Sequence, residues 1–219
     1  MMKHLFMKPT TKIIMALILL ITTAYSCGGG LTEEERWNPE LPPITQTGAN
    51  TFGCKINGKI MIPRDSRYGH PGGGGIPTGV TYSRSRPPLT GTNYDYIEAI
   101  DRYTSRGGIT FKLPNIQTLG VGEYLVKTVK GAFSTSLDGS FPDTNIVYMG
   151  AAYNGNSPTA GYSSIEGTGK IIITRYDNDI ISGTFYCKLK NDIYPDDIIE
   201  VTEGRFDFTK STINTTKFR

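Results

Sequence analysis

The chain has 219 residues, of which 37% are hydrophobic, and it carries 23 lysines and arginines against 20 aspartates and glutamates. Three of the lysines and none of the acidic residues precede Cys27, so the chain beyond this cysteine has 20 basic and 20 acidic residues and is neutral. A neutral domain has no long-range field that would gather a polyanion, and the basic residues form no block. We therefore expect no nucleic-acid partner.

The first 26 residues have the layout of a bacterial secretory leader. Lysines stand near the start, an apolar run extends from Ile13 to Ile21, and the small residues Ala24 and Ser26 precede Cys27. As a helix the apolar run spans roughly 13 Å, less than half of the hydrocarbon thickness of a bilayer, which suits a signal peptide rather than a spanning anchor. We predict a lipoprotein signal peptide over 1–26 with lipid attachment at Cys27. The alternative is an ordinary secreted protein cut near Ser26.

Lipid on Cys27 would anchor the chain to a membrane. The acyl chains of a bacterial lipoprotein, palmitate among them, provide more than one membrane-binding signal, which suffices for stable anchoring. We expect the outer membrane as the location, on either the periplasmic face or the cell surface, with the membrane bound through the lipid. The acidic run from Glu33 to Glu35 resembles the export tag of surface lipoproteins in the Bacteroidota, and both faces stay open.

The composition after Cys27 predicts a tether followed by one β domain. Residues 27–49 contain glycine, which frees the chain, and proline, which stiffens it, so we expect a flexible tether there. The remaining residues, 50–219, suit a single domain with its own hydrophobic core. The chain has 26 glycines, 13 prolines and 13 tyrosines and no long helical periodicity, which indicates many short strands joined by turns.

The clearest local element is a β-hairpin after the tether. Two strand-like runs, Thr51–Ile56 and Lys59–Ile62, flank the pair Asn57-Gly58. Asparagine followed by glycine accepts positive φ at both central positions of a type I′ turn, which matches the twist of a hairpin. Pro63 then ends the second strand, because proline cannot donate to a strand ladder.

Further strand-like stretches occupy the middle of the chain. They are Val80–Ser83, Tyr94–Tyr103, Gly108–Leu113, Gly122–Val129 and Asn145–Tyr153. Within the third stretch Ile109, Phe111 and Leu113 share one face and polar residues share the other, which predicts a half-buried strand stopped by Pro114.

The C-terminal part predicts a three-stranded antiparallel meander. Gly169–Tyr176 is rich in isoleucine, a turn at Asp177–Asp179 leads into Ile180–Leu189, and a turn at Asn191–Asp197 leads into Ile198–Phe208. With the earlier stretches this makes about ten strands, so we predict an all-β fold, an antiparallel β-sandwich. A closed, lipocalin-like β-barrel is the alternative.

Four segments of this domain resemble one family as a set. They are the hairpin Asn50-Thr-Phe-Gly-Cys-Lys-Ile-Asn-Gly-Lys59, the strand Gly169-Lys-Ile-Ile-Ile-Thr-Arg-Tyr-Asp177, the stretch Ile181-Ser-Gly-Thr-Phe185 and the closing Val201-Thr-Glu-Gly-Arg-Phe-Asp207. The set is similar to uncharacterised Bacteroidota lipoproteins that share an all-β domain of unknown function. The resemblance implies an envelope location and an all-β fold, and it implies no reaction and no catalytic residue.

Cys54 and Cys187 are expected to point into the core. Each alternates with two large apolar residues along its strand and therefore shares their face. In an oxidising envelope a disulfide between Cys54 and Cys187 is one interpretation, provided that their Cα atoms lie within about 7 Å. Two buried free thiols are the other.

Motifs for catalysis and phosphate binding are not found. Beyond the leader the single histidine, His70, lies beside Pro71 and the run Gly72–Gly75, which is a poor place to hold a base in one rotamer. The segment Gly167-Thr-Gly-Lys170 lacks both the first glycine and the final hydroxyl residue of a phosphate loop. We predict no catalytic residue.

Acidic turns are the remaining candidates for a metal site. Asp177–Asp179 forms one such turn, and Asp192, Asp196 and Asp197 lie in the next. Neither follows the pattern of the EF-hand calcium loop, and turns of this kind are common for their own local hydrogen bonding. We therefore predict no metal and no cofactor.

The expected function follows from the location and from the missing motifs. We predict a lipid-anchored envelope or cell-surface protein with a non-enzymatic binding or structural role, whose partner is a glycan or an envelope protein. The 13 tyrosines make a glycan-binding module one alternative, although tyrosine is also favoured in strands. A carbohydrate-active enzyme built from dispersed acidic residues is the other alternative. A row of exposed tyrosines would favour the first, and two facing carboxylates in a cleft would favour the second.

Overall fold

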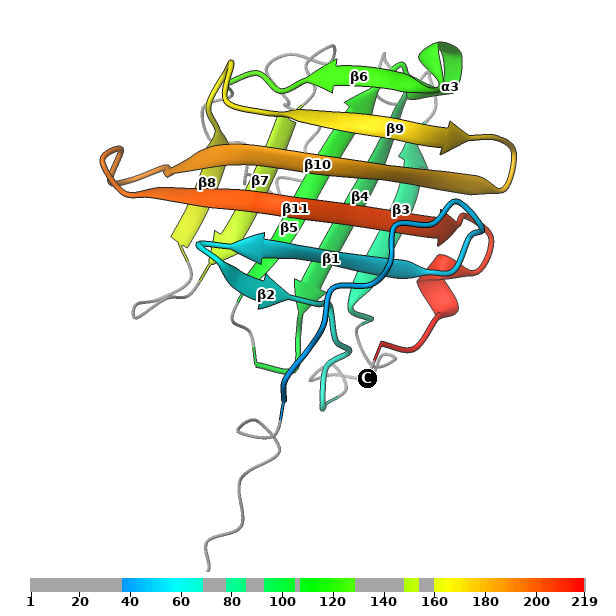
Figure 1. Ribbon diagram of the computed structural model, residues 1–219, viewed down its shortest axis with the longest axis horizontal. Coiled ribbons are helices and arrows are strands. Elements are labelled where there is room, and N and C mark those ends of the chain that lie inside the picture. Colours follow the sequence, from blue (N-terminus) through cyan, green and yellow to red (C-terminus); the bar gives the residue numbers. More distant parts are fainter. Residues whose placement is uncertain are drawn as a thin grey trace, which may run out of the picture. The chain divides into compact units, whose positions relative to one another are not determined.

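The computed structural model describes residues 37–68, 78–85, 93–104, 107–128, 148–153 and 160–218. One compact unit extends from Pro39 to Arg219, and its described part is mostly strand, with little helix (Figure 1). The predicted leader, Cys27, His70 and the Gly72–Gly75 run lie outside the described residues.

The strands form two antiparallel layers that lie face to face (Figure 1). The front layer runs in the order β2 (Lys59–Met61), β1 (Thr51–Ile56), β11 (Ile198–Thr209), β10 (Ile180–Asn191), β9 (Lys170–Tyr176) and β6 (Gly122–Leu125). The back layer runs in the order β8 (Ala160–Ser164), β7 (Tyr148–Tyr153), β5 (Gly107–Pro114), β4 (Tyr94–Asp101) and β3 (Val80–Ser85). A short helix, α3 (Ile116–Leu119), follows β5, and a 3₁₀ turn, η1 (Ile213–Thr215), follows β11.

Strand β10 belongs to both layers. Its residues Ile181–Tyr186 pair with β9 in the front layer, whereas Leu189–Asn191 pair with β8 in the back layer. A strand that changes sheets in this way makes a corner of a sandwich. The predicted all-β sandwich is confirmed, and the described strands do not close into the barrel that was its alternative.

The core lies between the two layers and is centred on phenylalanines. Phe111 comes from β5 in the back layer, and its ring meets the ring of Phe185 from β10 edge to face at 4.6 Å between centroids. Phe52, Phe206 and Phe208 complete the cluster from β1 and β11. Alternation directs these residues inward, as in β4, where every second residue is buried.

The hairpin and the meander formed as the sequence predicts. Asn57 and Gly58 have φ values of 48° and 77°, the positive values that a type I′ turn needs, and they join β1 to β2. Strands β9, β10 and β11 pair in sequence as the meander. Strand β8 was not predicted, because its Ala-Gly-Tyr-Ser-Ser sequence has too few apolar residues to give a period-two pattern.

The prediction of a half-buried strand at Ile109–Leu113 is wrong. Every residue of β5 is buried, including Thr110 and Lys112 on the face turned away from the phenylalanine cluster. The Nζ of Lys112 lies 4.7 Å from the centroid of the Tyr94 ring, a cation–π contact. The alternation of apolar and polar residues therefore predicted correctly which side chains of β5 face the core. It did not predict that the side chains on the other face are buried as well.

Cys54 and Cys187 are both buried and are free thiols. Cys54 lies on β1 and Cys187 on β10, and β11 runs between these two strands. Two strand spacings amount to about 9.6 Å, more than the about 7 Å that a disulfide tolerates between Cα atoms. Of the two interpretations that the sequence left open, the structure has the pair of buried thiols, and burial raises the pKa of each thiol.

Candidate functional site

The segment 39–49, here called the strap, crosses the outer face of the front layer before β1 begins (Figure 1). Residues 39–49 of the predicted tether belong to the compact unit and bind to it through side-chain and backbone groups, whereas residues 27–36 lie outside the described residues. The main anchor of the strap is Asp207 of β11, which lies 160 positions further along the chain than Thr47.

The carboxylate of Asp207 is buried, with only 1% of the residue exposed, on the outer face of β11 under the strap. Hydroxyl and backbone N–H groups from two segments donate to its oxygens. They are Thr45 Oγ1 at 2.6 Å, Thr47 N at 2.9 Å, Gly48 N at 2.8 Å and Ala49 N at 3.2 Å from the strap, and Ser182 Oγ at 2.6 Å from β10. Burial by itself would raise the pKa of Asp207, but the donors from Ser182, Thr45 and the strap outweigh it and hold the pKa well below its usual range.

The strap itself is shaped by glycines. Gly48 has a φ of 76°, and a Cβ at this position would lie 2.2 Å from Thr209 Oγ1, whose hydroxyl donates to the carbonyl of Gly48 at 2.8 Å. Gly53 of β1 lets Leu41 and Pro42 approach, since a Cβ there would lie 2.7 Å from Pro42 Cδ. Without side chains at these two positions the strap can lie close against the sheet.

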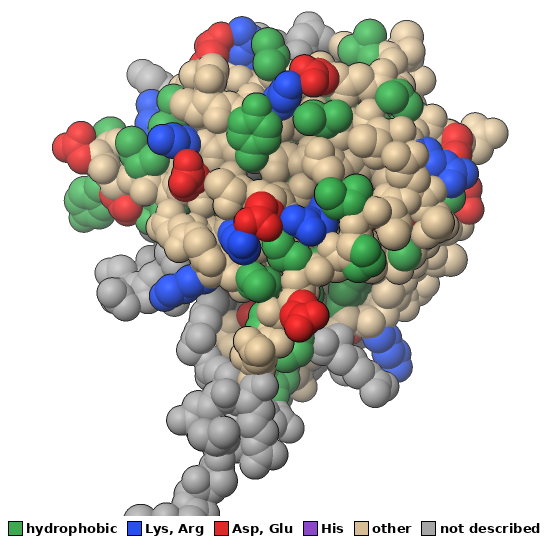
Figure 2. Space-filling view, in the orientation of Figure 1, with side chains coloured by type: hydrophobic (Ala, Val, Ile, Leu, Met, Phe, Trp, Pro, Cys, Tyr) green, Lys and Arg blue, Asp and Glu red, His purple; other side chains and the backbone are tan. Residues whose placement is uncertain are grey.

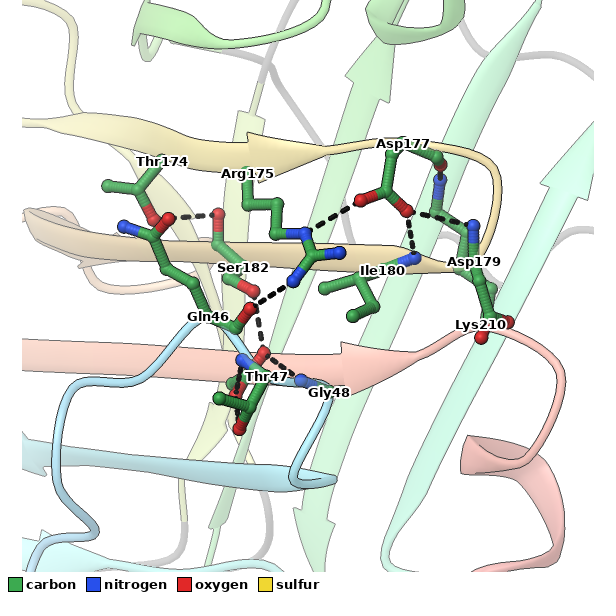
Figure 3. Close-up of polar contacts among 11 residues, drawn as sticks. Gln46, Thr47, Gly48, Thr174, Arg175, Asp177, Asp179, Ile180, Ser182 and Lys210 are labelled. Atoms are coloured by element: carbon green, nitrogen blue, oxygen red, sulfur yellow. Dashed lines mark hydrogen bonds and ion pairs between the residues drawn. The ribbon is translucent and has the colours of Figure 1, made fainter.

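Arg175 of β9 makes a second contact with the strap, separate from that of Asp207. Its guanidinium donates to the carbonyl of Gln46 and, through Nε at 2.6 Å, to the carboxylate of Asp177 (Figure 3). The same carboxylate accepts the backbone N–H groups of Asp179 at 3.0 Å and Ile180 at 2.7 Å. These N–H groups, with Arg175, lower the pKa of Asp177 to about 2.

A second buried carboxylate, Asp95 of β4, lies between the two layers near one end of the sandwich. The hydroxyls of Tyr82 from β3 and Tyr176 from β9 both donate to its Oδ2, at 2.7 and 2.9 Å. Gln117 of α3 donates to Oδ1 at 3.1 Å, and Arg84 Nε lies 3.5 Å from the same oxygen. Asp95 has no exposed surface. It therefore links the two layers by accepting hydrogen bonds from Tyr82 of the back layer and Tyr176 of the front layer.

The cations Arg84 and Lys210 lie beside the group formed by Asp95, Tyr82 and Tyr176. Arg84 donates to the hydroxyl of Tyr176 at 3.1 Å, and Lys210 Nζ lies 3.6 Å from the centroid of the Tyr176 ring. Burial, followed by the negative charge of Asp95, raises the pKa of both tyrosines well above its usual range, so their hydroxyls stay protonated and act as donors. Burial and the charge of Arg84 lower the pKa of Lys210.

The carboxylates of the acidic turns considered as metal sites accept hydrogen bonds from other groups of the fold. The carboxylate of Asp177 bonds within its own turn and to Arg175, as described above. In the next turn Asp192 accepts the hydroxyl of Ser163 at 2.6 Å, and Asp197 accepts that of Tyr162 at 2.7 Å. Within the described ranges no three histidine, cysteine or acidic side chains are grouped as they would need to be to hold a metal ion.

The exposed tyrosines of the described segments do not form a row. Tyr68 follows β2, Tyr186 lies on the outer face of β10, and Tyr194 lies in the turn between β10 and β11, with exposed fractions of 77%, 44% and 68%. Figure 2 shows the outer face of the front layer, where single apolar side chains stand among charged ones of both signs. A stacking platform for sugars would need aromatic rings side by side.

Sequence reasoning missed both Asp95 and Asp207 as sites. Asp207 was noted only as the end of the Gly-Arg-Phe-Asp motif, and Asp95 only as part of a strand. The available signal was an aspartate inside an apolar strand, as in Phe206-Asp207-Phe208, because aspartate is depleted in strands unless something pairs with it.

Comparison with known proteins adds no relative: no protein-family model, no curated protein and no solved structure matches the chain. Of the helices that the structure describes, none has the length and apolar character needed to cross a bilayer.

Proposed function

We propose that this protein is a bacterial lipoprotein of the outer membrane, held by acyl groups on Cys27, with a non-enzymatic binding or structural role toward another envelope protein. The observation that carries the proposal is the leader, in which lysines, the apolar run Ile13–Ile21 and small residues precede Cys27. The absence of net charge beyond Cys27 supports an envelope partner rather than a polyanion.

The two buried carboxylates support a structural rather than a chemical role. Asp207 is engaged by the strap and by Ser182, and Asp95 by two tyrosines and Gln117. A catalytic acid or base needs a free position for the substrate proton. Here the donors that occupy these oxygens belong to the fold, and their removal would disturb packing before it changed any reaction.

Metabolic labelling tests the anchor. Cells producing the full chain are given an alkyne analogue of palmitate, and we expect label on the wild type and a loss of at least about tenfold in Cys27→Ser, since the thiol is the attachment point. Cys187→Ser is the matched control and should keep the label. Equal labelling of the wild type and Cys27→Ser, or an unlabelled wild type, would overturn the proposal.

Fractionation of the same cells tests the location. The wild type and Cys187→Ser should sediment with the outer membrane, and Cys27→Ser should move to the soluble fraction, because without lipid only the β domain could bind the envelope. A Cys27→Ser chain that still sediments with the outer membrane would show that lipid is not what holds it there.

A further inference from the structure

The turn between β10 and β11 together with the first residue of β11, residues Asp192–Ile198 and here called the tip, presents apolar side chains to solvent. Ile193 is 73% exposed, Tyr194 68% and Ile198 49%. The tip extends past the ends of the neighbouring strands in Figure 1, and green and red side chains lie together at this edge in Figure 2. Exposed apolar groups gathered in one element are a sign of an interaction site.

The backbone of the tip is held in one conformation by Asn191. This residue is 3% exposed, and its Oδ1 accepts the N–H groups of Ile193 at 2.9 Å and Tyr194 at 3.2 Å. Its Nδ2 donates to Asp197 Oδ2 at 2.9 Å, and its backbone N–H donates to the carbonyl of Asp197 at 2.8 Å. Both ends of the tip are therefore joined through one buried side chain.

Strand β8 fixes the tip from outside the hairpin. The hydroxyl of Tyr162 donates to Asp197 at 2.7 Å, that of Ser163 donates to Asp192 at 2.6 Å, and the N–H of Asp192 donates to the carbonyl of Gly161 at 2.9 Å. The bonds from Tyr162 and Asn191 lower the pKa of Asp197 and keep it charged. These bonds therefore hold the tip in the conformation that exposes Ile193 and Tyr194 before any partner binds.

Pre-organisation of this kind reduces the entropy lost on binding, and tyrosine is among the residues that most often dominate protein interfaces. Between Asp192 and Ile198 there are three carboxylates and no basic residue, so the tip combines an apolar end with local negative charge on a neutral domain. We propose that the tip docks into an apolar pocket bordered by basic side chains on a partner protein of the envelope. This inference rests on the proposed binding role and names the chemistry of the partner.

Charge argues for a protein rather than a bilayer as the occupant. Carboxylates are repelled by anionic headgroups, whereas Lys and Arg on the rim of a protein pocket would pair with Asp192 and Asp196. Complementary charge also speeds encounter and sets the orientation in which the apolar end enters.

Site-specific photo-crosslinking in intact cells tests the proposal. The full chain carries benzoylphenylalanine at position 193, with position 186 on the outer face of β10 as the matched control. We expect one discrete protein adduct from position 193 and none from position 186. Adducts of equal yield at both positions, or no adduct at position 193, would overturn the proposal.

Second substitutions in the chain labelled at position 193 test the chemistry. Tyr194→Ser should lower the adduct yield about tenfold, as expected for an interface anchor, and Asp196→Lys should lower it severalfold. Glu40→Lys on the strap should leave it unchanged. The Tyr194 side chain is exposed, so thermal unfolding should show that Tyr194→Ser stays folded. Unchanged yields in both tip variants, or a crosslinked partner peptide without Lys or Arg, would contradict the proposed pocket.

The Cys27→Ser background separates this inference from the anchor. The full chain with that substitution is mixed with neutral phosphatidylcholine vesicles, and we expect Tyr194→Ser to leave the amount of flotation unchanged. Flotation that disappears in Tyr194→Ser would make the tip a membrane contact and overturn the protein partner. A crosslink at position 193 that persists while palmitate labelling of Cys27 fails would uphold the tip and refute only the anchor.

Discussion

Asp207 and Asp95 are both buried aspartates, yet they are satisfied in different ways. The donors to Asp207 are neutral, and most come from the backbone and hydroxyls of the strap, which lies on the outside of the front layer. The donors to Asp95 are side chains from β3, β9 and α3, with Arg84 beside them, and they lie between the layers. Asp207 therefore holds the strap against the outer face of one sheet, whereas Asp95 joins the two sheets of the sandwich.

The largest expected effect is that of Asp207→Ala. It leaves the N–H groups of Thr47, Gly48 and Ala49 without their acceptor, and we expect a loss of about 3 kcal/mol or more in the free energy of unfolding. Urea unfolding measures this loss, and hydrogen exchange at the three amides should accelerate. Asp196→Ala in the exposed tip is the control and should stay within about 0.5 kcal/mol of the wild type. Slow exchange at these amides in Asp207→Ala would show that the strap does not depend on the carboxylate.

Asp95→Asn should have the next largest effect, and it tests whether Asp95 and Asp207 act separately. The amide keeps the shape but weakens the acceptor for Tyr82 and Tyr176, so we expect a loss of about 2 kcal/mol in the free energy of unfolding. The strap amides should exchange as slowly as in the wild type, because their acceptor is untouched. Tyr176→Phe, which removes a single donor, should lose about 1 kcal/mol. Faster exchange in the strap of Asp95→Asn would mean that the two carboxylates do not act separately.

Gly53→Ala tests the close approach of the strap without touching either carboxylate. The new Cβ would lie 2.7 Å from Pro42 Cδ and 2.7 Å from Ile62 Cδ1, so we expect a loss of about 1.5 kcal/mol from overpacking. Gly122→Ala is the matched control, since nothing lies within 4 Å of a Cβ at that position. Thermal or urea unfolding of both variants checks the difference, and equal stabilities would mean that the strap can shift freely.

Acid should weaken the strap anchor by the smallest amount. The pKa of Asp207 is held below its usual range in the folded protein, so the unfolded chain takes up a proton first as the pH falls. The stability that Asp207 contributes is complete above its unfolded pKa of about 3.9, and about 1 kcal/mol of it should be lost between pH 5 and pH 3. Asp207→Asn should lack this part of the pH dependence. Equal slopes in the wild type and Asp207→Asn would contradict the assignment.

The sequence predicted those parts of the fold that depend on neighbouring residues. The turn at Asn57-Gly58 and the alternation in β9, β10 and β11 are local signals, and they were sufficient for the hairpin, the meander and the sandwich. The strap was missed because its proline and glycine content is also that of a linker, and only Asp207, far along the chain, distinguishes the two. The burial of Lys112 was missed for a related reason, since alternation reports which face a residue shares but not what covers that face.

The strap also determines how the β domain would bear mechanical load. Force applied at Pro39 reaches β1 only after it has passed through the contacts of the strap with Asp207 and Arg175. If those bonds yield first, residues 39–49 can straighten to a total length of at most roughly 36–40 Å before any strand of the sandwich is pulled. The strap would then detach under load before the sheets separate, and, if the proposed lipid on Cys27 holds the chain, the domain could move farther from the membrane while the two sheets remain intact.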